Sequence, residues 1–137
     1  MHKILVSGGL GFIGSNLIKI LLIKKYKVVN IDKVSYSSNF YNTKKFLNNK
    51  NYTFIKCDLN NSKKIGNILN KFKPKCIFNL AAETHVDRSI DNPKNFINSN
   101  ILGTFNLLES FKKYSKLKKN TLLIHISTDE VYGDILK

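Results

Sequence analysis

Four glycines near the amino terminus restrict the possible folds more than any other segment. They follow a short strand-like run, Lys3–Ser7, and precede an apolar helix-like run, Ser15–Lys25. Gly9, Gly11 and Gly14 fit G-x-G-x-x-G, and Gly8, Gly11 and Gly14 fit the variant G-x-x-G-x-x-G. Glycine permits the tight turn from strand to helix and lets backbone N–H groups approach a pyrophosphate at the helix amino terminus. The segment therefore predicts a dinucleotide-binding turn.

A second strand-like run, Lys27–Asp32, ends in an acid and supports this interpretation. Asp32 lies 18 residues after Gly14, close to the roughly 20 residues expected for a carboxylate that binds the adenosine ribose hydroxyls. The alternative is a flexible glycine loop with Asp32 as a helix cap. The Ser-, Tyr- and Asn-rich stretch Val34–Asn42 is expected to be a loop over the ribose end of the cofactor.

Strand-like and helix-like segments alternate along the whole chain. Strands are predicted at 3–7, 27–32, 52–57, 76–80 and 122–127, and helices at about 12–25, 42–49, 61–72 and 93–115. Asn92 and Pro93 mark the start of the last helix. Continuous apolar strands between helices predict an α/β fold with a Rossmann-type, doubly wound parallel sheet of about five strands. Right-handed crossovers give the strand order 3-2-1-4-5. Residues 1–137 are expected to form a single, incomplete domain.

Composition excludes several functional classes. The net charge is +14, but Arg88 is the only arginine among 23 basic residues, so the bidentate fork that reads nucleic acid is almost absent. We therefore expect no nucleic-acid partner, although a basic surface attracts anionic nucleotides. No apolar run approaches the roughly 18 residues of a membrane helix, and no leader is apparent before the first strand. A cytoplasmic location is expected.

The cysteines and histidines do not predict a metal site. Cys57 and Cys76 lie 19 residues apart, and His2, His85 and His125 share no ligand spacing. We expect two buried free thiols in a reducing compartment.

The acids are few and concentrated at predicted strand ends. Six of the nine occupy such positions: Asp32, Asp58, Glu83, Asp87, Asp129 and Glu130. Ligands of doubly wound sheets bind at the carboxyl ends of the strands. Adjacent carboxylates repel each other, which separates their pKa values and suits one as acid and the other as base. The Asp129-Glu130 pair thus fits a dehydration, whereas the alternative is an ordinary solvated turn.

Four segments together resemble the extended short-chain dehydrogenase/reductase superfamily, and within it the dTDP-glucose 4,6-dehydratases of deoxysugar (rhamnose) biosynthesis. They are Ser-Gly-Gly-Leu-Gly-Phe-Ile-Gly-Ser (7–15), Ile-Asp-Lys (31–33), Leu-Ala-Ala-Glu-Thr-His-Val-Asp-Arg-Ser (80–89) and Ile-Ser-Thr-Asp-Glu-Val-Tyr-Gly-Asp (126–134). The Asp-Glu pair is the discriminating part. Sugar-nucleotide epimerases carry small or hydroxyl residues there, and related dehydratases and decarboxylases typically have Ser-Glu.

The resemblance implies a role for each matching residue. NAD would take a hydride from C4 of a nucleotide-activated glucose and later return it to C6. Glu130 would remove the C5 proton, Asp129 would protonate the departing C6 hydroxyl, and Thr128 would bind the C4 oxygen. Thr84, where Ser is more usual, would also contact the nucleotide-sugar substrate. The NAD site would comprise Gly8, Gly11, Phe12, Ile13, Gly14, Asp32, Lys33, Val34, Ser35, Asp58, Leu59, Leu80, Ala81, Ala82 and Ser99. Asp32 would favour NAD over NADP, and Lys33 would moderate that preference.

The family's downstream Tyr-x-x-x-Lys pair is not found after Glu130, since the sequence continues for only seven residues. Tyr41/Lys45, Tyr52/Lys56 and Tyr114/Lys118 have the spacing but precede the fifth strand. Three interpretations stay open: the amino-terminal portion of a dehydratase, or one half of a split enzyme; a non-catalytic NAD-binding module; and an epimerase or decarboxylase relative. A homodimer, partly through the helix at 93–115, or a complementary carboxyl-terminal chain is a possible partner, and strand 122–127 would be an unpaired edge.

Overall fold

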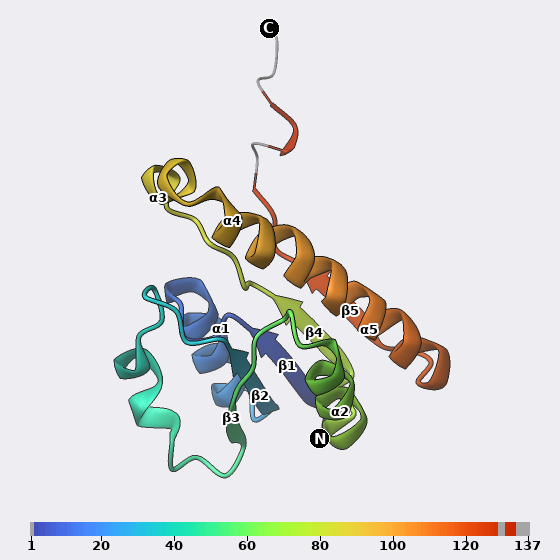
Figure 1. The fold of residues 1–137 in the computed structure, drawn as a ribbon. Helices are drawn as coiled ribbons and strands as arrows, with labels where there is room; N and C mark the ends of the chain where they lie inside the picture. Colours follow the sequence, from blue (N-terminus) through green and yellow to red (C-terminus); the bar gives the residue numbers. More distant parts are fainter. Residues whose placement is uncertain (1, 129–130, 134–137) are drawn as a thin grey trace, which may run out of the picture.

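The computed structural model describes residues 2–128 and 131–133, and its centre is a five-stranded parallel sheet (Figure 1). The strands are β1 (Lys3–Ser7), β2 (Lys27–Asp32), β3 (Tyr52–Lys56), β4 (Cys76–Asn79) and β5 (Leu122–His125). Their order is β3-β2-β1-β4-β5, as predicted. The last three strands end one or two residues earlier than expected.

Both faces of the sheet are covered, because each strand sends alternate side chains to opposite sides. Ile4 and Val6 of β1 pack with Ile18, Leu21 and Leu22 from α1 (Phe12–Ile23) in one core cluster. Leu5 points the other way and packs with residues of α2 (Ser62–Phe72) and α5 (Gly103–Leu117), including Ile65, Leu69 and Leu107. This two-sided burial explains why the strands are apolar runs rather than alternating ones.

Two predicted helices differ in length or type. The helix expected at 12–25 ends at Ile23, because Lys25 adopts a left-handed conformation (φ 62°) and donates its N–H to Leu22 O. The helix expected at 42–49 is a 3₁₀-helix, η1 (Phe40–Phe46), whose first turn is capped by Asn39 through Tyr41 N at 2.9 Å. It covers the edge of the sheet beside α1.

The segment expected as one helix at 93–115 is interrupted. After a short helix that was not predicted, α3 (Val86–Asp91), the chain forms α4 (Pro93–Phe96), a π-helical segment η2 (Ile97–Leu102) and α5. Pro93 occupies the first position of α4, as expected. In η2 the Gly103 N–H bonds to Asn98 O, five residues earlier. This wider turn places Ser99 and Asn100 on the side of the sheet's carboxyl ends, and π-turns of this kind are common at functional sites.

The strand β5 is the last in the sheet order and pairs with β4. Leu122 at its start and Ile126 just after it are 56% and 44% exposed. An apolar strand at a sheet edge is a place where further chain can pair.

Gly14 and Gly66 provide a matched test of the glycine loop. A Cβ on Gly14 would overlap the Gly8 carbonyl oxygen and lie 2.8 Å from Gly9 Cα, whereas a Cβ on Gly66 in α2 meets nothing within 4 Å. We expect Gly14→Ala to lower the free energy of unfolding by about 2–3 kcal/mol or to prevent folding. Gly66→Ala should raise it by about 0.5–1 kcal/mol through helix propensity. Urea unfolding followed by circular dichroism measures both, and equal effects of the two substitutions would contradict this description of the loop.

Candidate functional site: a pocket at the carboxyl ends of the strands

A pocket opens where β1, β2, β3 and β4 end. Its lining comes from the last residues of β1 and β2, from the segments that follow the four strands, and from η2. The lining residues are Ser7, Gly8, Gly11, Ile31, Asp32, Lys33, Ser35, Ser37, Ser38, Cys57, Asp58, Leu59, Leu80, Ala81, Ala82 and Ser99. The pocket therefore occupies the position at which ligands bind in open α/β sheets.

The glycine loop forms one wall of this pocket at the start of α1. Gly8 has a φ of 74°, and a Cβ there would lie 2.7 Å from the backbone of Leu80 and Ala81. Gly11 N–H bonds to Gly8 O at 3.2 Å, and Gly11 is the extended residue that precedes α1. The first-turn N–H groups of a helix have no acceptor within the helix, so this wall suits an anionic group.

Asp32 ties the ends of β1 and β2 together beneath the pocket. Its Oδ2 accepts a hydrogen bond from Leu10 N at 3.0 Å, and its Oδ1 accepts from Val34 N at 2.9 Å and Ser38 Oγ at 2.8 Å. The residue is only 7% exposed. The carboxylate therefore holds in place both the glycine loop (residues 8–14) and the serine-rich loop (residues 34–42). A carboxylate offers about four acceptor positions, so it retains capacity for a ligand hydroxyl.

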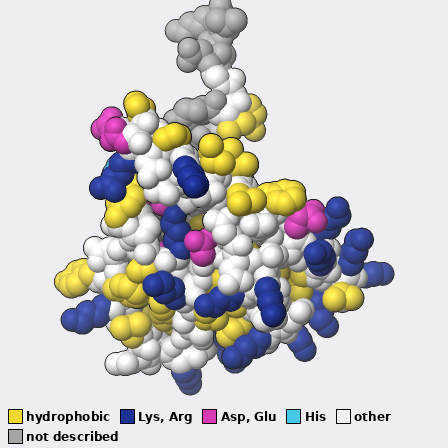
Figure 2. Space-filling view, in the orientation of Figure 1, with side chains coloured by type: hydrophobic (Ala, Val, Ile, Leu, Met, Phe, Trp, Pro, Cys, Tyr) yellow, Lys and Arg dark blue, Asp and Glu magenta, His cyan; other side chains and the backbone are white. Residues whose placement is uncertain are grey.

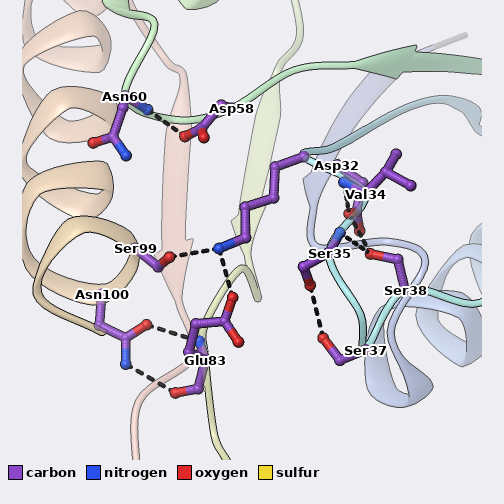
Figure 3. A network of polar contacts seen from close by, with 11 residues as sticks. Asp32, Val34, Ser35, Ser37, Ser38, Asp58, Asn60, Glu83, Ser99 and Asn100 are labelled. Atoms are coloured by element: carbon purple, nitrogen blue, oxygen red, sulfur yellow. Dashed lines mark hydrogen bonds and ion pairs between the residues drawn. The ribbon is translucent and has the colours of Figure 1, made fainter. Parts of the chain in front are cut away.

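A polar network crosses from β2 to β4 and η2 (Figure 3). Lys33 Nζ lies 2.5 Å from Glu83 Oε1 and donates to Ser99 Oγ at 2.6 Å. Glu83 is anchored by Asn100, which accepts from Glu83 N at 2.8 Å and donates to Glu83 O at 2.9 Å. The other carboxylate oxygen, Oε2, is buried and has no hydrogen-bond partner of standard geometry among the described residues.

Tyr36 joins the serine-rich loop to the segment after β4. Its ring centroid lies 3.8 Å from the Arg88 guanidinium carbon and 5.6 Å from the His85 ring centroid. Desolvation raises the pKa of the Tyr36 hydroxyl, the neighbouring Glu83 carboxylate raises it further, and the Arg88 charge acts in the opposite direction. A cation–π contact of this kind helps to fix the loop across the pocket.

The strand ends are also connected by buried polar groups that sequence reasoning did not identify. Ser7 Oγ donates to Asn79 Oδ1 at 2.5 Å, and Asn79 Nδ2 lies 3.0 Å from His125 Nδ1. Ile126 N–H bonds to Asn79 O at 3.0 Å. Asn79 thus sets the position of β5, and with it the start of the segment that leads to Thr128. A buried amide in an otherwise apolar strand was the available signal.

The structure brings most of the predicted cofactor residues together, but not all. Of the predicted set, Phe12, Ile13, Gly14 and Val34 do not line the pocket. Phe12 and Ile13 are exposed by 81% and 62%, Gly14 supports the loop from behind, and Val34 donates its N–H to Asp32. Lining residues that were not predicted are Ser7, Ile31, Ser37, Ser38 and Cys57. Ligands of doubly wound sheets bind at the carboxyl ends of the strands, so the positions of Ser7 and Ile31 at predicted strand ends could have indicated them.

The predicted substrate-binding and catalytic residues are not among the described residues that line the pocket. Thr84 and Thr128 are exposed and do not line the pocket. Asp129 and Glu130 lie outside the described residues. Of the tyrosines with Tyr-x-x-x-Lys spacing, Tyr52 accepts from Asn30 Nδ2 and Tyr114 donates to Pro74 O in buried contacts away from the pocket. Tyr41 lies on a separate groove between α1 and η1.

Neither thiol is paired in the structure. Both are free cysteines; Cys57 is buried as expected, whereas Cys76 is only partly buried. Desolvation raises the pKa of both thiols. Within residues 2–128 and 131–133, no group of three or more His, Cys, Asp or Glu side chains is arranged to hold a metal ion. The described helices include none that is long and apolar enough to cross a membrane.

The basic side chains are distributed over the surface. Figure 2 shows Lys and Arg spread across the visible face rather than gathered in one stripe. The pocket differs from this surface, because its lining contains two acids, Asp32 and Asp58, and one lysine.

Comparisons with known proteins support the resemblance expected from the sequence. The chain is 45% identical to dTDP-glucose 4,6-dehydratase of Haemophilus influenzae over 141 residues, which covers 98% of this chain and 42% of the relative. It is also 45% identical to the dTDP-glucose 4,6-dehydratase of Escherichia coli, covering 97% of this chain and 38% of the relative. The chain thus spans about two fifths of the length of these curated relatives.

Solved structures give the same fold. Bacillus anthracis dTDP-glucose 4,6-dehydratase in complex with NAD matches with a TM-score of 0.85 and 37% identity, over 100% of this chain and 40% of that one. UDP-glucose 4-epimerase of Thermotoga maritima with UDP-glucose matches with a TM-score of 0.83 and 32% identity, over 98% and 41% of the two chains. A family model described as GDP-mannose 4,6 dehydratase matches residues 5–137. The chain therefore belongs to the GDP-mannose 4,6 dehydratase family.

Proposed function

We propose that this chain is the NAD-binding part of a nucleotide-sugar 4,6-dehydratase that acts on dTDP-glucose in the pathway to rhamnose. The observation that carries the proposal is the pocket at the strand ends, which contains eleven of the fifteen residues expected to bind the cofactor. The relatives named dTDP-glucose 4,6-dehydratase support the substrate class. The free thiols fit a reducing, cytoplasmic location.

The pocket residues fit a dinucleotide in their chemistry. The glycine loop offers backbone N–H groups at a helix amino terminus, which suit a pyrophosphate. Asp32 has acceptor capacity for the adenosine ribose hydroxyls, and its charge repels a 2′-phosphate. Leu59, Ala81 and Ala82 supply small or apolar surface. When bound, NAD would supply the hydride acceptor and donor of the reaction.

The acid–base steps are assigned to the segment that follows β5. Glu130 removes the proton from C5 of the sugar, and Asp129 protonates the hydroxyl that leaves C6. Thr128 binds the C4 oxygen, and Thr84 contacts the sugar. Support for these roles comes from the matching Ser-Thr-Asp-Glu run, from the attachment of β5 to β4 through Asn79 and His125, and from the need of a dehydration for both an acid and a base.

The first test is calorimetric titration of the 137-residue chain with NAD⁺. We expect saturable binding, and we expect Ala82→Leu to weaken it at least about tenfold, because the larger side chain fills the pocket without entering the core. Asn67→Leu is the matched control, since it adds the same side chain at an exposed position of α2. Absence of NAD⁺ binding by a chain that unfolds cooperatively would overturn the proposal, as would equal binding by both variants.

The catalytic assignment is tested in a form that spans the relatives' full length. Asp129→Asn and Glu130→Gln should each lower formation of the 4-keto-6-deoxy product by about 10²–10⁴-fold, the usual contribution of general acid–base catalysis. NAD⁺ affinity should stay unchanged, because neither side chain belongs to the proposed cofactor site. Unchanged turnover in both variants would contradict the assignment. NAD⁺ binding without any turnover in the parent protein would instead favour a non-catalytic NAD-binding module.

We also propose that the protein forms a homodimer through the helical segment 93–117. Ile97, Ile101, Phe105 and Leu108 recur at helical spacing and are 45–66% exposed. Such an apolar row is typical of a protein interface. Sedimentation should therefore show a dimer that Phe105→Glu dissociates, whereas Lys113→Glu, a charge reversal at an exposed position on another face of the same helix, should leave it intact. A monomer at all concentrations would contradict this proposal.

A further inference from the structure

Among the described residues that line the pocket, Lys33 is the single cation, although the chain as a whole is strongly basic. The net charge of the chain is +14, but the residues that line the pocket include Asp32, Asp58 and one lysine. Lys33 follows Asp32 directly, so a free ammonium group there would lie next to the carboxylate expected to bind the ribose. An unpaired lysine at this position would attract a 2′-phosphate, which carries up to about two negative charges.

In the structure the Lys33 ammonium group is already paired, so it is not free to bind a 2′-phosphate. Lys33 Nζ contacts Glu83 Oε1 at 2.5 Å and donates to Ser99 Oγ at 2.6 Å, so two of its three N–H groups are used. These partners come from the end of β4 and from η2. In Figure 3, Ser35, Ser37 and Ser38 of the loop that contacts Asp32 lie on one side of the view, and Ser99 and Glu83 lie on the other.

Glu83 is built into the fold as a fixed counter-charge. Its side chain is only 5% exposed, and Asn100 bonds to its backbone N–H and carbonyl. Its Oε2 is buried and has no partner of standard geometry in the described part of the chain. Lys33 is the cation paired with this carboxylate, and the Tyr36 hydroxyl also interacts with it. Separating the ion pair would leave a buried charge without a counter-charge, which is costly. This cost keeps Lys33 paired.

We propose that Glu83 is a positioning residue that makes the pocket selective for NAD over NADP. It cancels the charge of Lys33 and directs the ammonium group toward Ser99, so the lysine cannot serve a 2′-phosphate. The negative charge of Asp32 then repels the 2′-phosphate, and the positive charge of Lys33 no longer offsets this repulsion. This inference rests on the proposed NAD-binding function. It adds Glu83 to Asp32 as a second residue that determines the choice between NAD and NADP.

The test compares NADP⁺ with NAD⁺ binding in Glu83→Gln. This variant keeps the side-chain shape and removes the charge, which frees Lys33. We expect the ratio of the NADP⁺ to the NAD⁺ dissociation constant to fall about five- to tenfold, the size expected for one partly exposed charge–phosphate contact. The gain should shrink as salt is raised, because the contact is electrostatic. In Lys33→Gln/Glu83→Gln the ratio should return toward that of the unmodified chain.

Glu109→Gln is the matched control. It removes the same charge from an exposed glutamate on α5 that lies 3.8 Å from Lys112, so it reproduces the change in net charge without touching the pocket. Its ratio should not move. A fall as large as that of Glu83→Gln would attribute the effect to net charge and overturn the inference.

The remaining outcomes separate this inference from the proposed function. Normal NAD⁺ binding with an unchanged ratio in Glu83→Gln overturns the inference alone. Absence of NAD⁺ binding by the unmodified chain overturns the proposed function and the inference with it. If Glu83→Gln does not fold, Glu83→Asp, which keeps the charge but withdraws it by one methylene, should lower the ratio by a smaller factor. An unchanged ratio in that variant would also contradict the inference.

Discussion

The close approach of the glycine loop to the end of β4 is the constraint on which the rest of this site depends. The backbone of Leu80 and Ala81 occupies the space that a side chain on Gly8 would need, and the Gly8 carbonyl occupies the space beside Gly14. Only glycine fits both positions, so the turn from β1 to α1 can pass directly across the top of the sheet. Asp32 then fixes this turn from the neighbouring strand by accepting from Leu10 N. The pocket lies between these strand ends and the end of β3.

Electrostatics separate the pocket from the rest of the molecule. Lysines cover much of the surface, and such a surface favours the approach of anionic nucleotides. Inside the pocket the balance is different, because Asp32 and Asp58 outnumber Lys33, and Lys33 is paired with Glu83. Under the proposed function, a chain of this composition would attract a nucleotide from a distance and still reject an additional phosphate at the ribose.

The sequence alone predicted the parts of this structure that follow from local patterns. Apolar runs such as Lys3–Ser7 and Lys27–Asp32 gave the strands, and the preference for right-handed crossovers gave their order. It could not predict the π-helical turn at Ile97–Leu102, because no local pattern marks it and its neighbours, such as Leu59 beside Gly103, are brought close only by the tertiary fold. For the same reason Glu83 was recognised as polar but not as the partner of Lys33. Their contact joins residues 50 positions apart and depends on the anchoring of Glu83 by Asn100.

The most direct test of the central claim, that the strand ends form a nucleotide site, is a ¹H–¹⁵N correlation spectrum of the chain recorded during titration with NAD⁺. The account predicts saturable shifts of the amides of Gly8, Gly11, Lys33, Ala82 and Ser99, with little change in the surface of α2. Shifts confined to the groove between α1 and η1, around Lys19 and Lys44, or no saturable shifts at all, would contradict it.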